Sequence, residues 1–134
     1  MSTEQILVES WPTPSGYANG RLGRGPVLHI AGQVGWTPDG TFPSRELPDQ
    51  FGRALDNVIA IVHAARGKVT DLASMTIYVT DIADYRARRR ELGPVWRARM
   101  GHHFPAMALV GVTALVEPDA LIEIQAIAHL EHDE

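Results

Sequence analysis

Glu123 is the side chain best placed to carry acid–base chemistry. It stands in the segment 122–128, where every neighbouring position but one is hydrophobic. A carboxylate among hydrophobic residues of a strand calls for a structural or functional explanation. A carboxylate held in an enclosed cleft can exchange protons with a bound water molecule, as a hydrolytic reaction requires. The alternative is a glutamate on an exposed strand face or in a salt bridge between subunits. The sequence leaves both open and makes Glu123 the first candidate catalytic residue.

A cluster of arginines is the second chemical feature. Six of the 12 basic residues lie in one segment, and they are Arg86, Arg88, Arg89, Arg90, Arg97 and Arg99. Arginines commonly cover the solvated face of a helix, which is the structural interpretation. The chain as a whole carries a net charge of −4, and no aromatic stacking platform accompanies the cluster. Nucleic acid is therefore not expected as a partner.

Other kinds of chemistry lack the residues they need. The chain has no cysteine, which excludes disulfides, thiolate nucleophiles and zinc sites built on cysteine. The six histidines show no metal-ligand spacing, and neither a phosphate-binding loop nor a nucleophile elbow is present, so no metal and no cofactor are expected. The longest stretch without polar side chains, residues 104–112, is far shorter than the roughly 20 residues of a membrane helix. We expect a cytoplasmic protein without a membrane partner.

The elements that position these residues fit a single α+β domain over residues 1–134. Hydrophobic residues at 51, 55, 58, 59 and 62 recur with helical spacing, and Pro48 and Gly67 suit the two ends of a helix. The predicted order is strands at 17–22 and 26–32, a helix at 48–66, a strand at 72–80, a helix at 83–100 with a kink or a break at Gly93-Pro94, and strands at 106–113 and 120–129 joined as a hairpin around 117–119.

The two faces of the predicted sheet differ in their expected partners. Both helices are predicted to cover one face, where Ile122, Ile124, Ala126 and Ala128 alternate with other residues. The opposite face is assigned an apolar set made of Met75, Ile77, Val79, Met107, Leu109 and Ile127. A face of that size is rarely left in water, so the pattern predicts association with copies of the same chain.

A series of motifs resembles the reactive-intermediate deaminase family (Rid, or YjgF-like, often labelled endoribonuclease). The motifs are 31–33 (Ala-Gly-Gln), 50–57 (Gln-Phe-Gly-Arg-Ala-Leu-Asp-Asn), 77–81 (Ile-Tyr-Val-Thr-Asp), 84–85 (Asp-Tyr), 105–107 (Pro-Ala-Met) and 122–128 (Ile-Glu-Ile-Gln-Ala-Ile-Ala). Each motif is weak by itself. Their common order and spacing extend the resemblance over residues 17–129, nearly the whole chain.

The resemblance implies a fold, an assembly and an activity. The fold is a chorismate-mutase-like α+β domain, a YjgF-like sheet with two helices on one face, assembled as a homotrimer around a central β-barrel. The activity is hydrolysis of enamine or imine intermediates with release of ammonia, in clefts between subunits that bind a small-molecule substrate. In such sites an arginine binds the substrate carboxylate and a glutamate of the last strand positions or activates water. A tyrosine of the first loop and backbone groups near Ser-Gly-Gln complete the site.

Carried over residue by residue, four positions match the family site. Glu123 takes the catalytic position, and Tyr17, Gly32 and Gln33 take substrate-binding positions. Four other positions of the site depart from the family pattern. Ala31 replaces the serine, Leu109 replaces a frequent cysteine, Arg89 stands near the asparagine of the second helix, and Met107 replaces the arginine.

The methionine at position 107 decides how the function is interpreted. Methionine cannot form the bidentate fork by which a guanidinium holds a carboxylate. We therefore expect Arg89 to reach the cleft as the missing cation, against the alternative of a solvated arginine. Met107 and Leu109 are expected to form an apolar wall for a larger, flatter substrate, against the alternative of ordinary packing.

Three functions remain open at this stage. The pattern Pro-Ala-Met-x-Leu-Val at 105–110, followed by Leu-Val-Glu-Pro at 115–118, is similar to a branch that includes 2-aminomuconate deaminases. The leading interpretation is therefore a hydrolytic deaminase of small enamine or imine metabolites, with a 2-aminomuconate-like substrate. The missing arginine favours the alternative of a non-catalytic trimer that binds a small molecule. An endoribonuclease activity ranks last.

Overall fold

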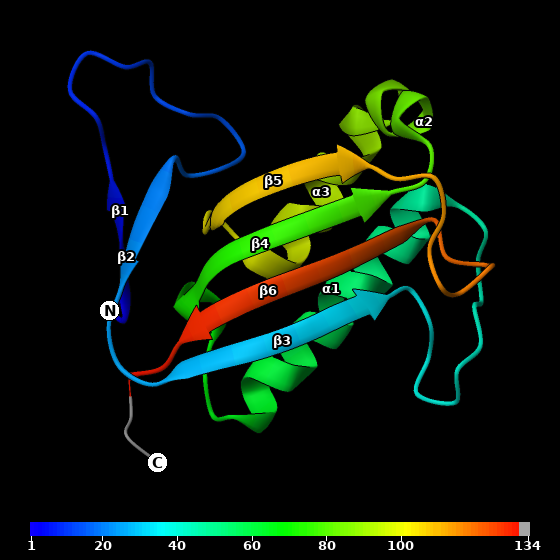
Figure 1. The fold of residues 1–134 in the computed structure, drawn as a ribbon, viewed down its shortest axis with the longest axis horizontal. Coiled ribbons are helices and arrows are strands. Elements are labelled where there is room, and N and C mark those ends of the chain that lie inside the picture. Colours follow the sequence, from blue (N-terminus) through cyan, green and yellow to red (C-terminus); the bar gives the residue numbers. More distant parts are fainter. Residues whose placement is uncertain (132–134) are drawn as a thin grey trace.

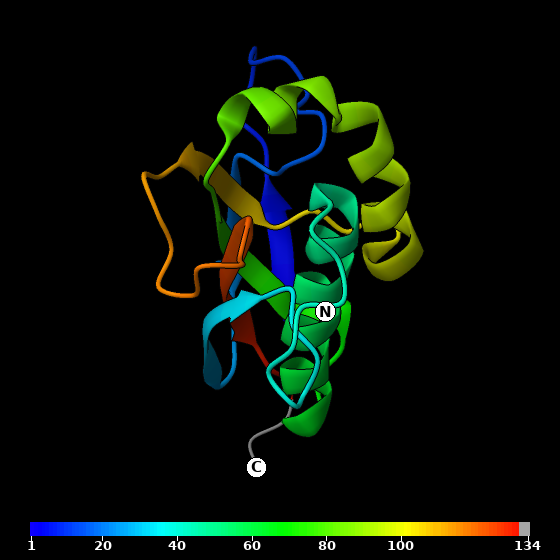
Figure 2. The ribbon, with the colours of Figure 1, turned by 90° about the vertical axis from the view of Figure 1, so that its right-hand side faces the viewer.

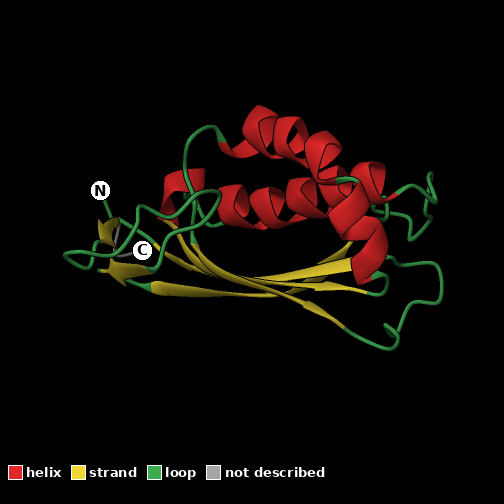
Figure 3. Ribbon diagram, turned by 90° about the horizontal axis from the view of Figure 1, so that it is seen from above, coloured by secondary structure: helices red, strands yellow, loops and turns green. Residues whose placement is uncertain are grey.

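A two-layer α+β arrangement is seen in the computed structural model, which describes residues 1–131 (Figure 1). Its elements are β1 (Thr3–Ile6), β2 (Gly20–Gly23), β3 (Val27–Val34), α1 (Leu47–Ala64), a 3₁₀ turn (Val69–Asp71), β4 (Leu72–Val79), α2 (Ile82–Ala87), α3 (Arg89–Met100), β5 (Ala106–Gly111) and β6 (Ile122–His129). The helices lie on one side of the main sheet, and no element of the described chain covers the other side (Figures 2 and 3). None of the helices within residues 1–131 has the length and apolar character needed to cross a membrane.

The main sheet has the strand order β3-β6-β4-β5. β6 runs antiparallel to both of its neighbours, whereas β5 runs parallel to β4 and is reached through α2 and α3. The predicted hairpin between the last two strands is therefore wrong, because β4 lies between β5 and β6. The physical reason is the connection at 112–121, which is long enough to cross past the neighbouring strand and does not force its two strands to pair.

α1 forms where the sequence predicts it. Pro48 lies in the first turn, and Phe51, Leu55 and Val58 belong to a buried stripe that packs on the sheet. The helix ends at Ala64, and the Gly67 N–H then bonds the Val62 carbonyl oxygen at 2.9 Å. A hydrophobic stripe with helical spacing and suitable residues at both ends is a strong signal for a helix, and the structure confirms the prediction.

The second predicted helix is divided in the structure. The break lies at Arg88, between α2 and α3, and Pro94 sits inside α3. A proline disturbs a helix on its N-terminal side, because its ring faces the carbonyl of the residue four positions earlier. Arg88 also forms ion pairs with Glu91 at 2.8 Å and with Glu46 at 3.0 Å. These contacts place the break one and a half turns before the predicted kink, by about 3.6 residues per turn.

The prediction for the two sheet faces is wrong for β4 and β5. Met75, Ile77 and Val79 are at most 3% exposed and face the helices. Met107 and Leu109 pair in register with Met75 and Ile77, so they share that face. The phase of β4 depends on a register shift between Leu72 and Ser74, which the alternation within one strand does not reveal.

The uncovered sheet face is mixed rather than apolar. Of the six residues assigned to it, only Ile127 lies there, among polar side chains from β4 and β6 that include Thr76, Tyr78 and Gln125. Tyr78 donates a hydrogen bond to Oε1 of Gln125 at 3.2 Å. The large apolar face that predicted self-association is therefore absent from residues 1–131, and this argument for association is lost.

The N-terminal residues form a hairpin away from the main sheet. β1 pairs with β2, while residues 7–19 form a loop that projects beyond the sheet (Figure 1). The buried Ser2 hydroxyl donates a hydrogen bond to the buried Asp71 carboxylate, which fixes the start of the chain to the turn before β4. The sequence predicted a strand at 17–22, and the structure has β2 at Gly20–Gly23 together with β1, which was not predicted.

Candidate functional site

A cleft of about 490 Å³ lies between β5, α3 and the first loop. This volume is within the range of sites for small molecules. Its wall contains a stack of aromatic rings, in which the Trp96 ring lies 5.7 Å from that of Phe104 and 6.3 Å from that of Phe51 between centroids. The rings of Trp96 and Phe104 are parallel, and Trp96 is only 6% exposed, so the stack is a packed apolar wall under the cleft.

The cleft brings together four of the predicted site residues. Tyr17, Arg89, Met107 and Leu109 all line it. The loop holds Tyr17 beside β5, because the Ala18 N–H bonds the Pro105 carbonyl oxygen at 3.0 Å. Arg89 therefore lines the same cavity as Met107, the residue that stands where the family places its arginine.

The charged side chains in the lining of the cleft are both basic, and both are exposed to solvent. Arg89 and Arg97 are the charged residues in its lining, and no aspartate or glutamate joins them. Throughout residues 1–131 neither guanidinium forms an ion pair, whereas Arg88 pairs with Glu46 and Glu91. Arg97 was not predicted as a site residue. Its helical spacing from Arg89 was a usable signal, but the sequence did not show which face of the helix meets β5.

A second group of predicted residues lies on the uncovered face of the sheet. Glu123 of β6 is half-buried there, and it pairs in register with Tyr78 of β4 and Val34 of β3. Its side chain lies against the backbone of Gly32, where a Cβ atom would come within 2.7 Å of the Glu123 Cδ. The absence of a side chain at Gly32 is therefore what leaves room for the carboxylate.

The backbone at Gly32 departs from a regular ladder. The register between β3 and β6 shifts between Ile30 and Gln33, and the Gln33 Nε2 donates to the Ala31 carbonyl oxygen at 3.2 Å. Such an irregularity re-aims backbone groups next to a side chain. Gly32 thus lies against Glu123, with Ala31 and Gln33 on either side of it along β3, and these residues form a second group of predicted site residues.

The two groups do not meet within one chain. Met107 and Arg89 lie on the helix side at the β5 edge, whereas Glu123 and Gly32 lie on the uncovered side, towards the β3 edge. In Figure 1 these two strands form opposite edges of the main sheet, with β4 and β6 between them. Within residues 1–131, the lining of the cleft therefore contains no acidic residue, and Glu123 lies on the opposite face of the sheet.

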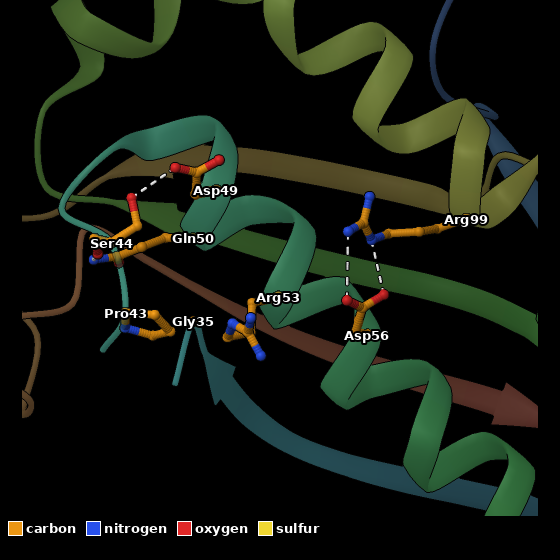
Figure 4. Close-up of a pocket in the computed structure, with 8 residues that line it drawn as sticks. All are labelled: Gly35, Pro43, Ser44, Asp49, Gln50, Arg53, Asp56 and Arg99. Carbon is orange, nitrogen blue, oxygen red and sulfur yellow. Dashed lines mark hydrogen bonds and ion pairs between the residues drawn. The ribbon is translucent and has the colours of Figure 1, made fainter. Parts of the chain in front are cut away.

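A second cavity of about 370 Å³ lies where the loop before α1 meets that helix (Figure 4). Its lining holds two acids, Asp49 and Asp56, and two arginines, Arg53 and Arg99, so the charges balance. Arg99 pairs with Asp56 at 2.8 Å, and Asp49 accepts a hydrogen bond from the Ser44 hydroxyl at 2.7 Å. The fully buried Gln50 donates to the carbonyl oxygens of Ser44 and Asp119 and accepts from the Leu121 N–H at 2.8 Å. This cavity is a structural junction that holds the start of β6, and the sequence analysis did not identify Gln50 in this role.

Histidine does not build a metal centre in the described part of the chain. No three histidine, aspartate or glutamate side chains lie together there in a way that could hold a metal ion. His103 is buried, and burial lowers its pKa from the ordinary value, which favours the neutral imidazole. Its Nε2 lies 2.7 Å from the Leu72 carbonyl oxygen, so the ring supports the start of β4.

Comparison with known proteins agrees with this fold. The family model described as Endoribonuclease L-PSP matches residues 10–130. A RutC family protein of Pyrococcus horikoshii is 33% identical over 129 residues, which cover 96% of this chain and 98% of that protein. The 2-iminobutanoate/2-iminopropanoate deaminase of Escherichia coli K12 is 32% identical over 130 residues, covering 94% of this chain and 97% of the enzyme. The crystal structure of a Rid family protein from Yersinia pestis superposes with a TM-score of 0.86 at 28% identity, covering 97% of this chain and all of that one.

The chain belongs to the Rid family, whose fold is the α+β YjgF-like domain described above. The family includes proteins named as imine deaminases, which is consistent at family level with a site that handles C–N bonds. The residues that match the family site lie in two separate groups of one chain. A site that uses both groups must therefore combine surfaces from more than one chain.

Proposed function

We propose that the protein is a hydrolytic deaminase of small enamine or imine metabolites. The observation that carries the proposal is the cleft itself, in which Arg89 lines the same cavity as Met107 beside a wall of packed aromatic side chains. A guanidinium there can bind a carboxylate that Met107 cannot hold. Membership of a family that contains imine deaminases supports the reaction type.

The proposed reaction follows from what Glu123 can do. An enamine takes a proton from solvent on carbon and becomes an iminium ion. Glu123 removes a proton from the attacking water as the new C–O bond forms, and then delivers that proton to the nitrogen as the C–N bond breaks. The hydroxyl proton that remains on the new carbonyl oxygen passes to the released ammonia. Iminium ion and water thus yield a carbonyl compound and ammonium, and the carboxylate regains its ionised form. Tyr17 orients the substrate, while Gly32 and Gln33 supply polar contacts.

The proposed site is assembled between subunits of a homotrimer with a central β-barrel. This arrangement would place the Glu123 group of one chain against the cleft of the next, and so combine the two residue groups that a single chain keeps apart. Both β3 and β5 are edge strands of the main sheet in the described residues, so each has unpaired backbone groups available to a neighbour.

Light scattering tests the assembly. We expect the protein in solution to have three times the mass of the 14.7 kDa chain. The mass should not change over a wide range of protein concentration, because an active site that forms only between subunits needs a stable interface. A species of 14.7 kDa at micromolar concentration would contradict the proposed assembly, and with it the shared site.

The substrate we propose is 2-aminomuconate-like, since Met107 and Leu109 give the cleft an apolar wall where a shorter imino acid would meet an arginine. We expect release of ammonia from freshly generated 2-aminomuconate at about ten times the rate from 2-iminobutanoate, a difference of about 1.4 kcal/mol in the barrier. Both rates are measured above the spontaneous hydrolysis in protein-free samples. No acceleration of either substrate would contradict catalysis. It would favour the alternative of a non-catalytic binding trimer, which the lack of a cation at position 107 supports.

A further inference from the structure

The segment 103–105, between α3 and β5, accepts a hydrogen bond at each of its three carbonyl oxygens. The first accepts from Nε1 of Trp96 at 3.3 Å, and the second accepts from Nη1 of Arg21 at 3.4 Å. The third accepts from the Ala18 N–H at 3.0 Å. Trp96 belongs to α3, but the other two donors belong to the N-terminal hairpin. The hairpin is therefore joined to the segment that leads into β5, the strand that carries Met107 on the wall of the cleft.

Arg21 of β2 connects three parts of the chain. Its Nε donates to the Thr3 hydroxyl of β1 at 3.0 Å, while its Nη1 reaches the carbonyl oxygen of Phe104. Thr3 is buried, and its hydroxyl donates in turn to the Thr70 carbonyl oxygen at 3.2 Å, in the 3₁₀ turn before β4. The donors of a guanidinium have fixed directions in one plane, so these bonds hold the hairpin and the segment 103–105 in one relative position.

Arg21 holds this position without a carboxylate partner among residues 1–131. Arg24, three residues further on, is exposed and pairs with Glu4 at 3.9 Å. Arg21 is half-buried instead, and burial lowers the pKa of its guanidinium from the ordinary value. Partial removal of a cation from water costs free energy, which the bonds to Thr3 and Phe104 must offset. An exposed arginine would avoid that cost, so the half-buried position favours a role in holding the hairpin in place.

Tyr17 depends on this connection for its place in the cleft. The next residue, Ala18, is 2% exposed and forms an isolated parallel bridge to Ala106 at the start of β5. On the other side of Tyr17, residues 7–16 belong to the projecting loop seen in Figure 1, and none of them is buried. A segment without buried side chains opens easily. The contacts of Ala18 and Arg21 are therefore what fixes Tyr17 beside β5.

We propose that Arg21 is a positioning residue for the cleft. By holding the hairpin against the segment 103–105, it keeps Tyr17 at the distance from β5 at which the phenol contacts the substrate. The proposal rests on the proposed function, in which Tyr17 orients the substrate, and it deepens that function by naming a residue outside the cleft lining that sets this orientation. Because Arg21 acts through Tyr17, its loss should weaken substrate binding and leave the chemical step unchanged.

Hydrogen exchange tests the connection without any turnover. In Arg21→Met the side chain keeps a similar length but loses every donor. We expect the Ala18 amide, which bonds the Pro105 carbonyl oxygen, to exchange about tenfold faster or more by NMR, because the contact opens more often. Amides in the pairing of β4 with β6 should keep their rates, since these strands lie apart from the hairpin.

Arg24→Met is the matched control for the exchange measurement. It removes the same charge from the same end of the chain, but at an exposed ion pair that contributes little to stability. Exchange of the Ala18 amide should stay within about twofold of the unaltered protein.

Kinetics of ammonia release test the effect on the cleft, with whichever of 2-aminomuconate and 2-iminobutanoate the protein turns over. Arg21→Met is expected to raise KM about five- to tenfold and to keep kcat within about twofold. In a Tyr17→Ala background the same substitution should raise KM no further, because both changes act through one side chain. Arg21→Lys keeps the charge, but one ammonium group cannot replace the guanidinium at both Thr3 and Phe104, so it should give a smaller rise in KM.

Three results would overturn the proposal. They are an unchanged exchange rate of the Ala18 amide in Arg21→Met, an equally large effect in Arg24→Met, and faster exchange with an unchanged KM. If Arg21→Met lowers the thermal midpoint strongly, Arg21→Lys at an unchanged midpoint decides by the same exchange measurement.

Failure of this inference is distinct from failure of the proposed function. Faster exchange at Ala18 in Arg21→Met, together with no ammonia release by the unaltered protein, supports the connection and refutes catalysis. Turnover in which Arg21→Met changes neither the exchange rate nor KM refutes the role of Arg21 alone.

Discussion

Replacing Glu123 with glutamine is expected to slow ammonia release by about 10²- to 10⁴-fold, the range typical for loss of a general acid–base group. Glutamine keeps the size of the side chain but cannot take a proton from water. Within residues 1–131 the Glu123 side chain forms no hydrogen bond or ion pair, so the substitution breaks none there. The measurement is kcat and kcat/KM for ammonia release, beside the thermal midpoint and the mass in solution.

A control variant separates the role of Glu123 from a general loss of negative charge. Glu117→Gln removes one carboxylate from the loop before β6, and it should keep the turnover within about twofold. If Glu123→Gln retains full turnover, or if both variants lose it equally, the assignment of Glu123 to proton transfer fails. A loss of activity together with a changed mass would place Glu123 in subunit contacts instead.

Local patterns predicted most of the elements, but not β1, the division of the second helix or the arrangement of the strands. The stripe of α1 and the alternation of β6 depend on residues close in sequence, and both agree with the structure. The side-by-side order of strands depends on pairings between distant segments. The placement of β4 between β5 and β6, and the register shift after Leu72, leave no mark on the spacing of hydrophobic residues. The errors in the hairpin and in the faces of β4 and β5 have this common origin.

For the candidate site too, the sequence predicts features that depend on neighbouring residues but not those that depend on contacts between distant segments. Helical spacing predicts that Arg89, Gly93 and Arg97 share a face, but the packing of Leu92 and Trp96 into the core decides which way that face points. The resemblance supplied a matching set of residues without showing that one chain divides it into two groups. Only the three-dimensional fold reveals that division, because it separates residues across the thickness and width of the sheet.

Gly32→Ala is the second substitution with a large expected effect, of about 10²-fold on kcat/KM for ammonia release. A Cβ atom at position 32 would lie 2.7 Å from Cδ and 2.9 Å from Cγ of Glu123, so the glutamate side chain must move. A misplacement of about 1 Å is enough to cost a reaction about 10²-fold. Gly32 has no positive φ that an alanine would strain, and it is exposed in the chain, so the free energy of unfolding should change by no more than about 0.5 kcal/mol.

The combination of lost activity and kept stability is what identifies a positioning role for Gly32. The control is Gly20→Ala in β2, where the added Cβ meets only the Ile6 Cβ at an ordinary 3.9 Å and activity should not change. The double variant Gly32→Ala with Glu123→Gln should be no slower than Glu123→Gln alone, because both changes act on one carboxylate. Additive losses in that double variant would mean that the added Cβ atom also displaces the substrate, independently of Glu123. Full activity of Gly32→Ala would mean that Glu123 acts from a position that the Cβ atom does not reach.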